Sequence, residues 1–175
     1  MLHIARQMES CASFGSVVLN KILFYADHIH YRDTGKKITN FKYVRQPMGP
    51  TPAPAEYMPI KTLLINKRDA KEETRDYFGR PQKRLLALAL PDYSVFSREE
   101  LATLEAAINS FRTVNGSTAS EISHQQELGW QLAGQMEDIP ASTFLLIEDD
   151  ISDTDIAWGK KHFDKFSKSR MAVRN

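Results

Sequence analysis

Residues 17–50 constrain the fold more than any other stretch of this chain. The first half of the stretch repeats apolar side chains at three- and four-residue steps, which is the period of a helix with one buried face. Those side chains are Leu19, Ile22, Leu23, Ala26 and either Ile29 or His30. A helix over residues 17–33 is therefore predicted, and the rest of the chain is expected to pack around it.

Residues on both sides mark the ends of this helix. Ser16 precedes the apolar run, where its hydroxyl is expected to cap free backbone N–H groups. Gly35 follows the run, and glycine most readily adopts the left-handed conformation that closes a helix. Residues 38–46 then alternate with the two-residue period of a strand. Residues 47–50, with the sequence PMGP, are expected to end that strand as a corner, because proline lacks the N–H that pairing requires.

The middle of the chain predicts shorter elements. Residues 2–11 have the apolar spacing of a short helix, and residues 54–66 predict a second one. The charged run 67–76 is interpreted as a solvated loop or an exposed helix end. A hairpin is expected over residues 74–90, with its second strand at 83–90, because Gly-Arg-Pro between the two runs is typical of a hairpin loop.

Capping boxes mark the helices that follow. In such a box the side chain of the first residue accepts a hydrogen bond from the backbone N–H of the residue three positions later. The acidic side chain of that later residue accepts one from the backbone N–H of the first. Ser97 with Glu100 has this form and opens a helix that carries apolar residues as far as Phe111. Residues 118–121 predict a second start, and Ser123 a third. A last helix is expected at about 154–167, followed by a frayed end at 168–175.

Together these elements predict an α+β fold. Five to seven helices are expected around the central helix, with a small two- or three-stranded antiparallel sheet at one edge, built from residues 38–46 and the hairpin at 74–90. A chain of 175 residues suggests a single domain. We expect that domain to occupy residues 1–150, with the C-terminal helix and tail of residues 151–175 packed on it.

Composition narrows the functional classes. The chain has 23 basic and 22 acidic side chains and a formal charge of +1, which argues against nucleic acid as its main partner. Its one cysteine, Cys11, cannot form an internal disulfide. No apolar run is long enough to span a bilayer, and no secretory signal is present. A cytoplasmic protein without membrane association is expected.

Two histidine–acid pairs are the candidates for metal or acid–base chemistry. Asp27 and His30 stand three residues apart on the central helix, and we interpret them as a hydrogen-bonded pair rather than as metal ligands. His124 and Glu127 have the same spacing, and His124 is expected to bond the backbone or Glu127. If both pairs converged, the four side chains would make a small metal-dependent enzyme the alternative function.

No other pattern indicates catalysis. Cys11 has no histidine or basic neighbour placed by the sequence to activate it. The motifs G-x-S-x-G, G-x-G-x-x-G, H-E-x-x-H and the P-loop are absent. The expectation is a protein that is not an enzyme and holds no metal and no cofactor.

A protein-binding surface is the remaining candidate. Tyrosine, arginine and methionine are enriched at interfaces, because they combine a large contact area with a polar or adaptable end. Five of them lie in the organising stretch: Tyr25, Tyr31, Arg32, Arg45 and Met48. The competing interpretation is that the aromatic residues simply pack in the core. The corner at residues 48–50 also offers a strand edge to which a partner peptide could add.

Several segments together resemble a known family. They are LNKILFYAD (19–27), YRDTGKKIT (31–39), YVRQPMGP (43–50), FSREEL (96–101) and SHQQELGWQLA (123–133). In this order they resemble the Panacea antitoxin domain, a family that includes SocA-type proteolytic adaptors and proteins labelled phage-associated. The resemblance extends over roughly residues 10–150, and it is the ordered set rather than any single segment that is specific.

The resemblance implies the antitoxin of a toxin–antitoxin pair. Such a protein neutralises a cognate toxin, encoded by an adjacent gene, by binding it directly; a SocA-like member would instead deliver the toxin to a bacterial protease. The resemblance also implies a structural role for the residues of the family motif. These are Asn20, Lys21, Asp27, Gly35, Tyr43, Gly49, Pro50, His124 and Trp130.

Overall fold

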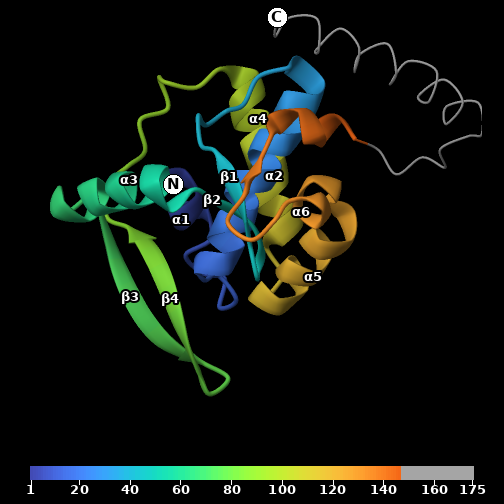
Figure 1. The fold of residues 1–175 in the computed structure, drawn as a ribbon. Helices are drawn as coiled ribbons and strands as arrows, with labels where there is room; N and C mark the ends of the chain where they lie inside the picture. The colour runs from blue at the N-terminus through green and yellow to red at the C-terminus, as the bar shows by residue number, and fades with distance from the viewer. Residues whose placement is uncertain (147–175) are drawn as a thin grey trace, which may run out of the picture.

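A computed structural model describes residues 1–146 of the chain and confirms the predicted α+β class (Figure 1). The elements are α1 (Leu2–Gln7), α2 (Ser16–Thr34), β1 (Tyr43–Gln46), β2 (Gly49–Pro52), α3 (Pro54–Asn66), β3 (Ala70–Tyr77), β4 (Arg80–Ala87), α4 (Arg98–Phe111), α5 (Gly116–Gln126), α6 (Leu128–Leu132), β5 (Asp138–Ile139) and the 3-10 helix η1 (Ala141–Leu145). The helix and tail predicted for residues 151–175 lie outside the described residues.

Helix α2 runs through the centre of the molecule, with α4, α5 and the β1–β2 hairpin around it (Figure 1). Its apolar residues Val18, Leu19, Ile22, Leu23, Phe24 and Ala26 are all at most 2% exposed. Gly35 ends the helix with a φ of 73°, as predicted, and its N–H bonds Tyr31 O at 2.7 Å. The predicted cap at Ser16 is wrong: the chain turns one residue earlier, so Gly15 takes the cap position and Ser16 is already helical.

The sheet around β1 differs from the prediction. The predicted strand 38–46 is shortened to β1, and Thr39 in the segment before it bonds Asp27 on α2. The expected corner at residues 47–50 is the turn of a hairpin, in which Gln46 pairs with Gly49 and Tyr43 with Pro52. Strand β5 pairs with the other side of β1, so the order is β2-β1-β5. Proline is tolerated in β2 because an edge strand needs fewer N–H donors.

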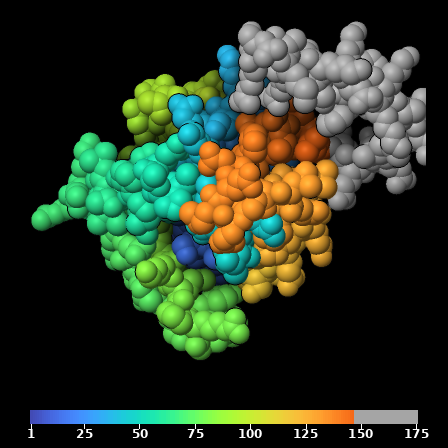
Figure 2. All heavy atoms as spheres, viewed as in Figure 1, coloured from blue at the N-terminus to red at the C-terminus, as the bar shows by residue number. Residues whose placement is uncertain are grey.

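Strands β3 and β4 form a separate two-stranded ribbon that projects from the body of the molecule (Figures 1 and 2). The prediction of a loop or helix end at residues 67–76 is therefore wrong, and the hairpin does not join the sheet of β1. Leu85 and Leu86 anchor β4 in the protein, at 3% and 6% exposure. Most side chains of β3 face solvent, so its charged sequence lacks the alternation from which a half-buried strand is recognised.

Helices α4 and α5 begin in different ways. Ser97 and Glu100 form the predicted capping box at the start of α4. The two starts predicted at residues 118–121 and at Ser123 are wrong. Asn115 caps α5 instead, accepting a hydrogen bond from Thr118 N at 3.0 Å, and one continuous helix runs to Gln126. The side chain of asparagine satisfies the free N–H as well as serine does.

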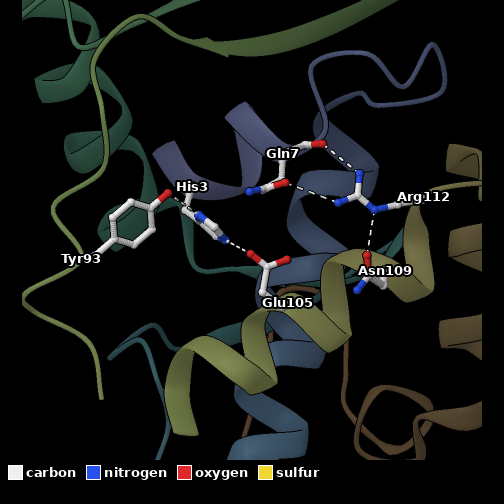
Figure 3. A network of polar contacts seen from close by, with 6 residues as sticks. All are labelled: His3, Gln7, Tyr93, Glu105, Asn109 and Arg112. Atoms are coloured by element: carbon white, nitrogen blue, oxygen red, sulfur yellow. Dashed lines mark hydrogen bonds and ion pairs between the residues drawn. The ribbon is translucent and has the colours of Figure 1, made fainter. Parts of the chain in front are cut away.

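A polar network fastens the short helix α1 to α4 (Figure 3). His3 Nε2 lies 2.7 Å from Glu105 Oε1, and His3 Nδ1 lies 3.1 Å from the hydroxyl of Tyr93. Arg112, just after α4, donates to the carbonyl oxygen of Gln7 at 3.1 Å. These bonds connect residues about one hundred positions apart in the chain.

Candidate functional site

The Asp27 carboxylate fastens the segment before β1 onto α2. It is completely buried and accepts hydrogen bonds from Tyr43 Oη at 2.7 Å and from both the N–H and the hydroxyl of Thr39. Burial raises the pKa of the Asp27 carboxyl, and the bonds from Thr39 and Tyr43 oppose that rise. The predicted Asp27–His30 pair is wrong. His30 Nδ1 lies 3.4 Å from Thr103 Oγ1 on α4, whereas Thr39 and Tyr43 bond both oxygens of Asp27.

The turn of the β1–β2 hairpin is seated between α2 and α5. Lys21 is 1% exposed, and its ammonium group donates to Pro50 O at 3.0 Å. A Cβ on Gly49 would stand 2.2 Å from Ser123 Oγ and 2.3 Å from Lys21 Nζ, so only glycine fits there. Burial lowers the pKa of Lys21 to about 7, although the negative charge of Glu127 acts in the opposite direction.

The side chains of His124, Trp130 and Arg45 stack beside the β1–β2 hairpin. The His124 ring lies parallel to the indole of Trp130, with 4.0 Å between ring centroids, and Arg45 Cζ lies 4.6 Å from the centre of the Trp130 ring. The indole N–H also donates to Gln46 O at 3.0 Å. Burial, followed by the positive charge of Lys21, lowers the pKa of His124, so the stacked imidazole is mainly neutral at pH 7. The guanidinium of Arg45 supplies the cation that an indole face attracts.

The four residues of the metal-enzyme hypothesis do not converge. Glu127 is 5% exposed and pairs with His28, whose Nδ1 lies 3.1 Å from Glu127 Oε2, rather than with His124. His124 Nε2 instead lies 3.3 Å from Ser120 Oγ. In residues 1–146, which contain all four side chains, no three histidine, cysteine, aspartate or glutamate residues are grouped to hold a metal ion.

The structure separates the five predicted binding residues into two groups. Tyr25, Tyr31 and Arg32 lie on α2. The ring of Tyr25 packs 5.4 Å from that of Phe111, and burial, then the charge of Glu127, raises the pKa of its phenol. Tyr31 is half-buried, whereas Arg32 is exposed. Arg45 and Met48 lie together on the β1–β2 hairpin.

Arg45 and Met48 belong to a surface that we call the Trp130 surface, defined as Arg45, Met48, Trp130 and Met136. Met48 and Met136 are 44% and 50% exposed. Met136 joins through its backbone N–H, which donates to Arg45 O at 2.9 Å. No sequence pattern predicted Met136 as a surface residue, and the family resemblance implies only a structural role for Trp130. The available indication was a tryptophan and a methionine six residues apart, with Leu132 between them.

Two other residues of the family motif, Gly35 and Asn20, belong to α2 and its C-terminal cap. Gly35 caps α2, as described above. Asn20 is half-buried on α2, and its side-chain Oδ1 is enclosed without a hydrogen-bond partner among residues 1–146. The structural roles implied for the motif residues remain predictions, but most of them lie in the contacts that seat the hairpin.

One family model matches the part of the chain that forms these contacts. The family model described as "Antitoxin SocA-like, Panacea domain" matches residues 19–131, more than half of the chain. The chain therefore belongs to this family of antitoxin domains. No curated protein and no solved structure matches it. The matched range begins in α2 and ends in α6, so it includes the seat of the hairpin and Trp130. None of the helices in residues 1–146 is long and apolar enough to cross a membrane.

Proposed function

We propose that this chain is the antitoxin of a toxin–antitoxin pair and neutralises a cognate protein toxin by binding to it directly, with the Trp130 surface as part of the interface. The observation that carries the proposal is the family membership over residues 19–131. An antitoxin domain requires a toxin as its partner, and the product of the adjacent gene is the first candidate.

The chemistry of the Trp130 surface supports a role in protein binding. Tryptophan, arginine and methionine are the side chains enriched at the centres of interfaces. Arg45 is pre-organised, because it stacks on Trp130 and also donates to Ala133 O at 2.5 Å. A side chain that is already ordered loses less conformational entropy when a partner covers it. Met48 and Met136, which are both exposed, supply adaptable apolar area.

The test is co-expression with the product of the adjacent gene, followed by growth measurement and purification of the complex. We expect the neighbour to be toxic alone, harmless with this chain, and to co-purify with it. A neighbour that arrests growth despite this chain, and that does not co-purify, would overturn the proposal. A toxin that disappears from cells only when a bacterial protease is active would assign proteolytic delivery rather than blocking.

A matched pair of methionine variants tests the surface. Met48→Lys places a charge on the Trp130 surface, whereas Met58→Lys makes the same change on α3 at almost the same exposure, 48% against 44%. We expect Met48→Lys to weaken toxin binding by about tenfold or more, as loss of an interface anchor does, and Met58→Lys to bind like the wild type. Equal affinities for the two variants would exclude Met48 from the interface.

A further inference from the structure

The tip of the β3–β4 ribbon presents the most exposed large apolar side chain in the described residues. Phe78 is 89% exposed, and its only ring neighbour among residues 1–146 is the adjacent Tyr77, at 4.8 Å between centroids. Folding therefore removes almost none of this ring from water. A phenylalanine in that position contributes little to the stability of the chain that carries it.

The backbone at the tip is also unfavourable for phenylalanine. Phe78 and Gly79 form a two-residue turn between the paired residues Tyr77 and Arg80, with φ angles of 52° and 75°. A turn with positive φ at both central positions strongly favours Asn-Gly or Asp-Gly. Phenylalanine adopts positive φ only at a cost, because its Cβ crowds the backbone. The residue is thus disfavoured both by its exposure and by its conformation.

The tip borders a hollow that extends to Met48 on the β1–β2 hairpin. A cavity of about 580 Å³ is lined by Phe78 and Tyr77 from the ribbon, by Val17 from α2 and by Met48 from the β1–β2 hairpin. Figure 2 shows dark blue atoms from the N-terminal part of the chain set back between the green atoms of the ribbon and the gold atoms of α5. Met48, which lines the hollow, lies on the same β1–β2 hairpin as Arg45, whose guanidinium stacks on Trp130.

The charge beside the tip is positive. Arg80 and Lys83 are exposed and form no ion pair with any of residues 1–146. Asp76 is the acid nearest to the turn in sequence, and it accepts a hydrogen bond from Gly79 N at 3.1 Å. A partner surface complementary to the tip would combine an apolar pocket for the ring with carboxylates around it.

We propose that the ribbon tip is a docking element for the protein partner, with Phe78 as the anchor that enters an apolar pocket rimmed by carboxylates. This inference rests on the proposed function, because the partner is the toxin. The ribbon projects from the body, so its tip can enter a concave surface on the partner (Figure 1). Strain at an exposed aromatic residue is retained because binding, rather than folding, uses the ring.

The substitution Phe78→Asn tests this inference, because it restores the preferred Asn-Gly turn and removes only the ring. We expect the midpoint of thermal unfolding to stay the same or rise by a few degrees, while toxin affinity falls by about tenfold to thirtyfold. The matched control is Leu90→Asn, which removes an apolar side chain that is 71% exposed outside the ribbon. It should bind the toxin like the wild type.

Three other outcomes of the Phe78→Asn experiment would overturn the inference. If the wild type binds and neutralises the toxin and Phe78→Asn does so equally well, the docking role is overturned while the proposed function stands. If the wild type neither binds nor neutralises, both fall. If the wild type is a dimer that Phe78→Asn converts to a monomer, the tip serves self-association and the inference is overturned.

The carboxylate rim has its own test. Arg80→Glu should slow association with the toxin and reverse the effect of added salt on the association rate, because a charge at the rim acts mainly on diffusional encounter. An unchanged association rate for Arg80→Glu would overturn the inference that carboxylates surround the partner's pocket. In that case, loss of affinity in Phe78→Asn would still support the apolar pocket.

Discussion

At the scale of single residues, two glycines are required for different reasons. One is needed for its backbone conformation alone, and the other also because a side chain would not fit. Gly35 and Gly49 both have positive φ, at 73° and 96°. A Cβ on Gly35 would meet nothing within 4 Å, whereas a Cβ on Gly49 would collide with Ser123 and Lys21. The first glycine is needed only to close α2, and the second also lets the hairpin approach two helices.

We therefore predict unequal losses when each glycine is replaced by alanine. Gly35→Ala should lower the free energy of unfolding by about 1 kcal/mol, the cost of a left-handed residue with a side chain. Gly49→Ala should lower it by about 3 kcal/mol or more, because the steric overlap adds to that cost. Urea denaturation of both variants measures the difference. Equal losses would contradict the close approach of the hairpin to α2 and α5.

Lys21 carries a prediction about pH. Its pKa is lowered from 10.5 to about 7 by burial, so between these values the unfolded chain binds more protons at this position than the folded chain. Stability then rises with pH in that window, by at most about 1.4 kcal/mol per pH unit from this group. Below pH 7 the ammonium is charged in both states and contributes no further slope.

The measurement is the difference in unfolding free energy between the wild type and Lys21→Met, followed from about pH 7 to about pH 10. Other titrating groups, including the buried tyrosines, cancel in this difference to a first approximation. We expect it to shift in favour of the wild type as pH rises. Lys67→Met, at an exposed lysine, is the control and should show no such trend. A constant difference for Lys21→Met would contradict the burial of its ammonium group.

At the scale of elements, α1 depends on its tertiary contacts. Six residues are too few for an isolated helix to form in water. The helix is held by Ile4 and Ala5 in the core and by the network of His3, Glu105 and Tyr93 (Figure 3). Its place in the fold is therefore set by α4 and by the segment before it.

We predict that His3→Ala loosens α1 selectively. Loss of two hydrogen bonds from a buried imidazole should lower the free energy of unfolding by about 1–3 kcal/mol and speed amide exchange in α1 more than in α5. Arg6→Ala, at an exposed position of the same helix, is the control and should change neither. Uniform acceleration of exchange throughout the protein would show that the network acts on global stability alone.

The ribbon shows why one element was predicted wrongly. The charges of residues 71–76 are compatible with a loop, an exposed helix end or a solvated strand, because none of these buries the segment. The pairing of Ala70 with Ala87 and of Tyr77 with Arg80 settles the choice in favour of a strand. The local sequence contains no such information, since the partner strand supplies both the hydrogen bonds and the buried leucines.

At the scale of the whole molecule, residues that lie far apart in the chain meet around α2. Asp27 holds Tyr43, Lys21 holds Pro50, and Trp130 covers the outer end of the hairpin. These contacts suit a scaffold that keeps the hairpin in one position. The exposed side chains beside that scaffold, at Met48 and Met136, are free to contact a partner.

The sequence by itself determined the class of fold, the central helix, its glycine end, α3 and the capping box of α4. Each of these depends on local periodicity, backbone conformation or a hydrogen bond over a few residues. The sequence also determined the family, because the ordered motifs can be recognised without knowing which residues are in contact.

Only the tertiary structure decided which partners the buried polar groups take. Asp27 bonds Thr39 and Tyr43 rather than His30, and Glu127 pairs with His28 rather than with His124. A three-residue spacing makes a contact possible within one helix, but a segment from elsewhere in the chain can offer a better donor. The choice between them is made by packing, which no local pattern records.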